Sequence, residues 1–519
     1  MDTRISVQFL GGVVGQLTGS CTLLTVRQGK RIINILIDCG LVQCGFKNSI
    51  TINQEILFHL DPKLIDYIIL THAHVDHGGR IPLLVANGFA GRIICTPETS
   101  SLLRVMLEDT AKILALEARH LAKLARKRGK NYQTRPNNPD RMTQGSYDRR
   151  KRKGKYLKTQ APSYAPLYTM EDVEATCKLV KNGGFGYRKW IRLDKGIDLK
   201  FYPPGHVLGG AICVIKIKTQ SGDVHLGFSG DLGREDGIIL PPPEYPEEKI
   251  DWWVTEGTYG GEIHPLREEE IARLFNLVRE AKKGNKKIII PSFALERAQE
   301  IIYVITDNMR KGIIPPIIIY LNSPMAAKIL NVFAACWRDG MFSDQASLDF
   351  NPFDPAENHY LRIVKNPTDS VKLIETPGPY IVIAGSGMCD AGRVREHLKN
   401  ELGNKETIVC IVGYMANNSL GRKLKDGLQA VKMNGNIINV KAEIVSFNSL
   451  SAHADKDHLV SFAKFVMDGN SNERARIFIV HAEKEGADCL ALELLQKLSG
   501  ENWSNRIIIP KLGEEIILY

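Results

Sequence analysis

The sequence of 519 residues lacks several features that would place it in common protein classes. No run of about 18 apolar residues occurs, so no transmembrane helix and no membrane partner are expected. The ten cysteines are scattered without a CxxC pair, which indicates neither a structural zinc finger nor a disulfide framework. The N-terminus has no signal-peptide pattern. These absences predict a globular, cytoplasmic protein in a reducing compartment.

Acidic residues are scarce in one segment, 119–158, which holds 15 Lys or Arg against Asp140 and Asp148. Its charge of +13 exceeds the chain's formal +10, so the remainder sums to −3. Few apolar residues and several Pro, Gly and Asn indicate an insert outside the core. Such a cationic segment, with Tyr132, Tyr147 and Tyr156 interleaved, predicts contact with RNA. A solvated loop or a contact with another protein stays open.

Apolar residues alternate between strand-like and helix-like patterns along most of the chain. Strands are expected at 4–12, 21–26 and 32–40, and a buried strand leads into residue 71. Four strand–turn–helix units follow one another between residues 286 and 428. Thr169, with Asp172 three residues later, is typical of a helix N-terminus. This alternation predicts an α/β protein with a parallel sheet flanked by helices.

One short stretch, THAHVDHGG at 71–79, concentrates side chains that bind metals. His72 and His74 alternate and therefore point the same way from an extended segment, whereas Asp76 and His77 lie in the turn that follows. The stretch can thus face two adjacent metal positions. Imidazole and carboxylate without thiolate suit Zn²⁺ or Mn²⁺. Two catalytic ions need about three protein ligands each, so other segments must supply the rest.

Three residues elsewhere could complete such a site. His206, Asp231 and His481 each follow an apolar strand-like run. Each of them, taken alone, is only a weak candidate for a metal ligand. Because the histidine stretch supplies too few ligands for two ions, it favours the interpretation of all three as metal ligands.

Together these motifs resemble the metallo-β-lactamase fold, and specifically its β-CASP branch of nucleic-acid hydrolases. THAHVDHGG matches the HxHxDH signature of that family, and LIDCG carries the aspartate that precedes it. PPGHVLGGA, GFSGDLG, VTEGTYGG, SFNSLSAHAD and VHAE resemble the later motifs in order. PSFALERAQE, LNSPMAAKI and SGMCDAGRVREHL resemble the domain inserted in this branch. Within it, the sequence is most similar to the cleavage and polyadenylation specificity endonuclease and its archaeal and bacterial homologues.

The resemblance implies an αββα metallo-β-lactamase sandwich with an inserted β-CASP domain, a parallel sheet flanked by helices. We expect the first part of the metallo-β-lactamase domain at 1–260, including the basic insert, and the β-CASP domain at 261–445. The returning part would occupy 446–519. A homodimer is an open option.

The resemblance also implies roles for individual residues. One zinc ion would bind His72, His74 and His206, the other would bind Asp76, His77 and His481, and Asp231 would bridge the two. His453 would protonate the leaving oxygen, Glu256 would orient His453, and Asp38 would support the metal ligands. Five residues are candidates for contacts with substrate phosphates: Arg297, Ser323, Ser386, Gly387 and Arg393.

These roles predict a two-zinc ribonuclease acting on single-stranded RNA, with Mn²⁺ as the alternative metal. We expect endonucleolytic cleavage, and 5′-exonucleolytic cleavage stays open. A DNA nuclease, a small-molecule metallo-hydrolase and a non-catalytic RNA-binding scaffold are the alternatives. The inserted domain and the basic segment disfavour a small substrate, and the full ligand set disfavours a scaffold. His481 favours RNA, because an apolar residue typically replaces it in the DNA-repair members of the family.

Overall fold

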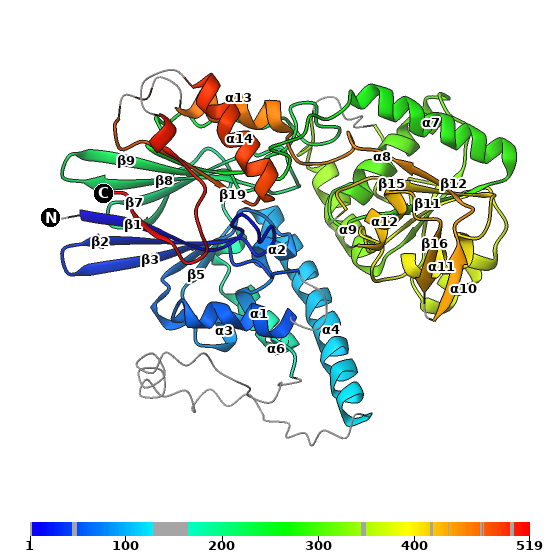
Figure 1. Cartoon of the computed structure of the whole chain (residues 1–519), viewed down its shortest axis with the longest axis horizontal. Helices are drawn as coiled ribbons and strands as arrows, with labels where there is room; N and C mark the ends of the chain where they lie inside the picture. Colours follow the sequence, from blue (N-terminus) through cyan, green and yellow to red (C-terminus); the bar gives the residue numbers. More distant parts are fainter. Residues whose placement is uncertain are drawn as a thin grey trace.

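The computed structural model describes residues 3–43, 49–127, 165–343, 349–415, 419–433, 435–467, 470, 472–498 and 503–519. Most of the basic segment therefore lies outside the described residues. Figure 1 shows two lobes side by side, with both chain ends in the first lobe. Among the helices that the structure describes, none combines the length and the apolar character needed to cross a membrane.

The first lobe is built around two β-sheets. One has six strands in the order β21 (Glu515–Ile517), β1 (Thr3–Gly11), β2 (Cys21–Gln28), β3 (Arg31–Ile37), β4 (Tyr67–Ile69) and β5 (Arg92–Ile94). The other has seven strands, ordered β20 (Ile507–Ile508), β19 (Arg476–Val480), β10 (Trp252–Glu256), β9 (Gly222–Phe228), β8 (Ile212–Thr219), β7 (Ile197–Tyr202) and β6 (Ile191–Asp194). The strands expected at the N-terminus are therefore present.

The two sheets pack face to face and helices cover their outer faces. Alternate residues of β1, such as Val7 and Phe9, meet Leu199 and Phe201 of β7 in the core between the sheets. Outside the first sheet lie α1 (Ser49–Gln54), α3 (Ile81–Ala86), α4 (Pro97–Lys127) and α6 (Met170–Lys178). Outside the second lie α13 (Lys456–Met467) and α14 (Lys484–Lys497). This is the expected αββα sandwich, and the reciprocal hydrogen bonds of Thr169 and Asp172 cap α6 as predicted.

The second lobe contains a six-stranded sheet in which all neighbouring strands are parallel. Its order is β13 (Leu361–Ile363), β12 (Ile318–Asn322), β14 (Tyr380–Ala384), β11 (Lys287–Pro291), β15 (Thr407–Ile411) and β18 (Glu443–Ser446). Its helices are α7 (Arg267–Gly284), α8 (Arg297–Arg310), α9 (Pro324–Arg338), α10 (Pro367–Glu375), α11 (Val394–Glu401) and α12 (Leu420–Lys425). A small hairpin of β16 (Ala430–Met433) and β17 (Asn436–Asn439) was not expected.

The second lobe is inserted between two neighbouring strands of the first. The chain leaves the first lobe after β10 and returns through α13 to β19, which pairs with β10 in parallel. Glu256, the last residue of β10, is in register with Val480, so His481 follows at the same sheet edge. The fold thus brings these two residues together although the whole inserted lobe separates them in sequence. The domain bounds at 260 and 445 stay a prediction.

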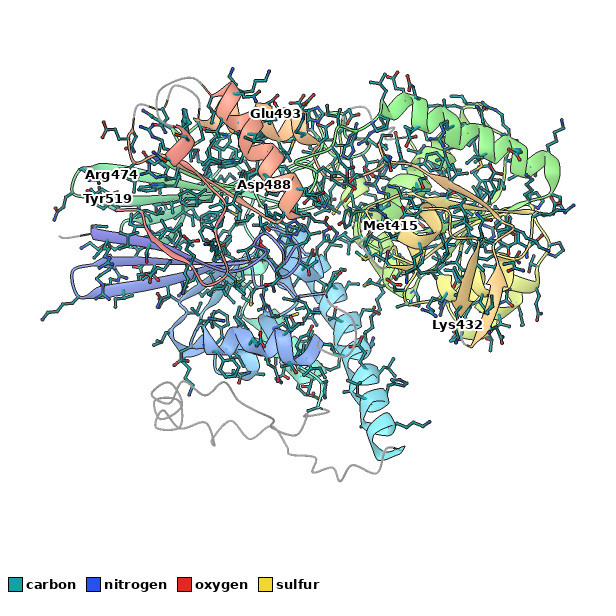
Figure 2. All side chains as sticks on the ribbon, in the orientation of Figure 1. Met415, Lys432, Arg474, Asp488, Glu493 and Tyr519 are labelled. Carbon is teal, nitrogen blue, oxygen red and sulfur yellow. The ribbon has the colours of Figure 1, made fainter. Side chains whose placement is uncertain are left out.

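The C-terminus closes the first lobe. Strand β21 adds to the edge of the first sheet beside β1. Figure 2 shows Arg474 next to the terminal Tyr519, and the guanidinium lies 5.3 Å from the centre of the tyrosine ring. The last residues therefore help to hold the two sheets together.

Candidate active site

The histidine stretch begins directly after strand β4, as the sequence predicts. His72 lies two residues past Leu70, outside any strand or helix, and His77 is on the short helix α2 (Val75–Gly78). His72 and His77 are buried, whereas His74 and Asp76 are half-buried. The four side chains therefore gather at one sheet edge, with part of the group open to a cavity.

Asp38 orients His77 and anchors the start of the histidine stretch at Thr71. It follows β3 in left-handed backbone, with φ 59°. One carboxylate oxygen accepts from the Thr71 backbone N–H at 2.8 Å, and the other accepts from the Thr71 hydroxyl at 2.8 Å. The second oxygen also lies 2.8 Å from Nδ1 of His77. This contact holds Nδ1–H toward Asp38 and leaves Nε2 free for a metal.

His206 lies in a loop that is held from both sides. Gly205 and Gly209 have φ of 69° and 76°, conformations that glycine adopts without strain. The hydroxyls of Thr96 and Thr99 donate to the Gly209 carbonyl at 2.5 and 2.6 Å. The loop is therefore attached firmly to the start of α4, which places the imidazole of His206 beside the histidine stretch.

Asp231 lies at the centre of the candidate ligands. Its Oδ2 is 3.7 Å from Nε2 of His72 and 3.6 Å from Nε2 of His206. Its Oδ1 is 3.2 Å from Nε2 of His77 and 3.9 Å from Nδ1 of His481. Each carboxylate oxygen thus faces a different set of histidines, as a bridging ligand requires.

The seven candidates form two groups whose ligand atoms lie within 4.8 Å of one another: His72, His74, His206 and Asp231 in one, and Asp76, His77 and His481 in the other. Several buried ligand atoms have no hydrogen-bond partner, among them Nε2 of His77, His206 and His481 and Oδ1 of Asp231. Buried polar atoms are normally paired, so these converging lone pairs fit cations. Burial lowers the pKa of His72 and His206 well below the usual range, which keeps both imidazoles neutral for metal binding.

The buried carboxylate of Glu256 pairs with His453 beside this cluster. Nδ1 of His453 lies 2.9 Å from Oε1 of Glu256, which is only 1% exposed. The backbone N–H groups of Leu232 and Thr258 donate to the two oxygens of Glu256 at 2.9 and 3.0 Å. Burial opposes protonation of His453, but the Glu256 carboxylate outweighs it and raises the pKa of His453 to about 9. Nε2 of His453 is 3.9 Å from Asp231, so a protonated imidazole would face the metal cluster.

One of the five candidates for phosphate contacts lines a cavity beside the metal-ligand cluster, and the other four do not line it. Arg297 lines the cavity but is buried and paired with Glu300. Arg393 donates to Asn322 and to the carbonyls of Val364 and Lys365.

The remaining three candidates lie in loops or at a helix start. Ser323 caps α9 by accepting from the Ala326 N–H. Ser386 and Gly387 lie in the loop after β14. Phosphate contacts by these residues stay predictions.

Sequence reasoning missed Glu296, which joins the inserted lobe to the His206 loop. Its buried Oε2 accepts from the Leu208 backbone N–H at 2.9 Å, and its Oε1 has no partner. Its backbone has φ 71° and ψ −61°, a tight turn closed by the Arg297 N–H and the Leu295 carbonyl. This conformation is rare and strained for a residue with a side chain. No composition or spacing signal marks it, because the neighbouring Arg297 looks more functional.

Comparison with known proteins agrees with this geometry. The sequence model of the metallo-beta-lactamase superfamily matches residues 14–145, that of the Beta-Casp domain matches 298–424, and that of the Zn-dependent metallo-hydrolase RNA specificity domain matches 437–510. Ribonuclease TTHA0252 of Thermus thermophilus is 30% identical over 97% of this chain and 98% of its own length. The chain belongs to the β-CASP branch of the metallo-β-lactamase superfamily.

Similar proteins also occur in archaea. The transcription termination factor FttA of Methanosarcina mazei is 25% identical over 96% of this chain and 70% of its own length. FttA of Cenarchaeum symbiosum is 25% identical over 94% of this chain and 68% of its own length. Membership of this β-CASP branch makes the chain a metallo-hydrolase, and the resemblance inferred from its motifs is confirmed.

Proposed function

We propose that this β-CASP protein is a two-zinc ribonuclease that hydrolyses phosphodiester bonds of single-stranded RNA. The central position of Asp231 carries the proposal, because its two oxygens face two separate groups of buried ligands. His72, His74 and His206 would hold one ion. Asp76, His77 and His481 would hold the other. Asp231 would be shared.

The protein's own side chains prepare the reaction around these ions. Two bound zinc ions would lower the pKa of the attacking water and compensate the charge of an in-line phosphoryl displacement. Asp38 keeps His77 in the tautomer that exposes Nε2. Glu256 keeps a proton on Nδ1 of His453 and raises the affinity of the ring for a second proton at Nε2. That proton, which faces the cluster, would be donated to the leaving oxygen.

RNA is favoured as the substrate by observations outside the metal cluster. The returning part of the chain matches an RNA specificity domain, and a relative similar over nearly its whole length is named a ribonuclease. The basic segment 119–158, whose first residues belong to α4, carries a charge of +13 that would attract a polyanion. A homodimer, a cytoplasmic location, and the balance of endonucleolytic and 5′-exonucleolytic cleavage stay predictions.

The test uses RNA and DNA oligonucleotides of one sequence, labelled at either the 5′ or the 3′ end. The purified protein is incubated with each, before and after chelation and after zinc or manganese is restored. We expect cleavage of RNA alone, lost on chelation and regained with zinc. Internal fragments from both labels indicate an endonuclease, and released mononucleotides from the 5′ label indicate an exonuclease. Equal cleavage of DNA would contradict RNA specificity, and no cleavage of either would contradict the proposed function.

A further inference from the structure

The lining of the cavity above the candidate metal ligands combines ionisable with apolar side chains. Its volume is about 760 Å³, and its lining includes His74, Asp76, Asp231 and His453. The inserted lobe contributes mainly apolar side chains to the same lining: Phe293, Ala294, Leu295, Met325 and Met388, together with Tyr414. A site that held only a phosphodiester backbone would present cations throughout. The apolar part therefore fits a different portion of a nucleotide.

Among the described residues, Arg80 and Arg297 are the arginines that line the cavity. Arg80 is buried and donates through Nη2 to the Gly19 carbonyl. Arg297 is buried and paired with Glu300. Both guanidinium groups are engaged within the protein. The part of the lining that comes from the inserted lobe thus offers surface for apolar contact and stacking.

Phe293 is the accessible aromatic ring of this surface. It lies two residues after β11 and is 36% exposed. A methyl group at Gly387 would lie 2.8 Å from Cδ2 of Phe293, and one at Gly413 would lie 3.5 Å from Cε2. The ring therefore packs against the backbone of two loops, after β14 and after β15, that have no side chains at these points. Packing on one side and exposure on the other leave the ring fixed and available to a ligand.

Tyr414 and Met388 line the same cavity as this ring. Both are half-buried, and the Tyr414 hydroxyl donates to Oε1 of Glu483 at 2.6 Å, across to the first lobe. Figure 2 shows Met415, the residue after Tyr414, on the side of the inserted lobe that faces the first lobe. Because its hydroxyl is already bonded, Tyr414 offers its ring rather than a hydrogen bond to a base edge.

We propose that Phe293 stacks on a nucleobase next to the scissile phosphate, with Met388 and Tyr414 completing an apolar base site. This inference rests on the proposed ribonuclease function. Every base has a π-face, so stacking tolerates all four bases and requires that the base be free of its own helix. The site therefore selects single-stranded RNA by the presence of a base and not by its identity. Methionine adapts its shape and suits such tolerance.

The test compares RNA with its base intact and RNA with an abasic nucleotide beside the cleaved bond. The wild type, Phe293→Ala, Phe293→Leu and Phe293→Tyr are assayed for kcat/KM on both substrates. Phe465→Ala is the matched control, because it truncates a ring that is 65% exposed on α13 and does not line the cavity. Zinc content and the thermal unfolding midpoint are measured for each protein.

On intact RNA, we expect Phe293→Ala to lower kcat/KM roughly 5- to 150-fold, the range that corresponds to stacking of one base. Phe293→Tyr should retain most activity, Phe293→Leu should lose most of it, and Phe465→Ala should match the wild type. On the abasic substrate, the wild type and Phe293→Ala should be equally slow.

The inference is overturned if Phe293→Ala is as active as the wild type on intact RNA. It is equally overturned if the variant loses the same factor on both substrates, or if Phe293→Leu is fully active, since either result assigns the ring a structural role. A wild type that cleaves no RNA would instead overturn the proposed function, so the two failures are distinguishable.

Discussion

Glu256 and His453 form a buried hydrogen bond of 2.9 Å at the edge of the candidate metal cluster. They are 197 residues apart in sequence, and the inserted lobe lies between them. Backbone N–H groups fix the Glu256 carboxylate, so its orientation does not depend on a flexible partner. A fixed anion behind an imidazole both orients the ring and favours its protonated form.

Replacing Glu256 by glutamine should shift the pH dependence of RNA cleavage. His453 must be protonated to donate its proton, and the Glu256 charge raises its pKa to about 9. Without that charge the pKa falls, so the loss of activity with rising pH should begin at a lower pH in Glu256→Gln. The pH profile of kcat/KM measures this. An alkaline limb at the wild-type position would contradict the assigned role.

His453→Ala should lower kcat by about 10²- to 10⁴-fold, the usual range for loss of a general acid. The defect should shrink on a substrate in which sulfur replaces the leaving oxygen, because a thiolate leaves without protonation. Rates on the two substrates, with zinc content as the control for an intact site, decide this. An equal defect on both would remove His453 from leaving-group protonation.

Glu296→Ala should weaken zinc binding by roughly tenfold, because the Leu208 N–H beside His206 loses its acceptor. Glu296→Gln keeps an acceptor oxygen and should bind zinc nearly as the wild type does. Glu296→Gly should unfold at a higher temperature than Glu296→Ala, because glycine adopts φ 71° without strain. Competition with a chelating dye and thermal unfolding test these expectations. Equal zinc affinity of the alanine and wild-type proteins would contradict them.

His397 should make the inserted lobe sensitive to acid. Burial lowers its pKa from the usual 6.5 to about 4, and the Asn322 side-chain amide donates to its Nε2 at 2.7 Å. The folded state therefore binds the proton less well than the unfolded state, and stability is lost as pH falls from about 6.5 to about 4. Each pKa unit corresponds to about 1.4 kcal/mol, so the loss is on the order of 3 kcal/mol.

The measurement for His397 is the thermal unfolding midpoint between pH 6.5 and 4. His397→Gln should show a shallower dependence on pH than the wild type. The exposed His359 supplies the control, and His359→Gln should keep the wild-type slope. Identical slopes for His397→Gln and the wild type would rule out this contribution.

The sequence could predict the parts of the site that follow strand ends. His72, Asp231 and His481 each come after a buried apolar strand, and the αββα layers follow from the strand and helix patterns. Glu296 could not be predicted, because its role depends on contact with Leu208, 88 residues away, and on an unusual backbone turn. The role of Phe293 could not be predicted for a similar reason, since the glycines against which its ring packs come from two other loops.

The proposal that the protein needs two bound metal ions to cleave RNA is tested most directly by Asp76→Ala. Asp76 belongs to the second ligand group, and its Oδ2 lies 3.6 Å from Nε2 of His481. Bound zinc per chain and cleavage of end-labelled single-stranded RNA are measured for the wild type and the variant. We expect two zinc ions and cleavage in the wild type, and one zinc ion without cleavage in an Asp76→Ala protein that stays folded. Cleavage at the wild-type rate by Asp76→Ala would contradict the account.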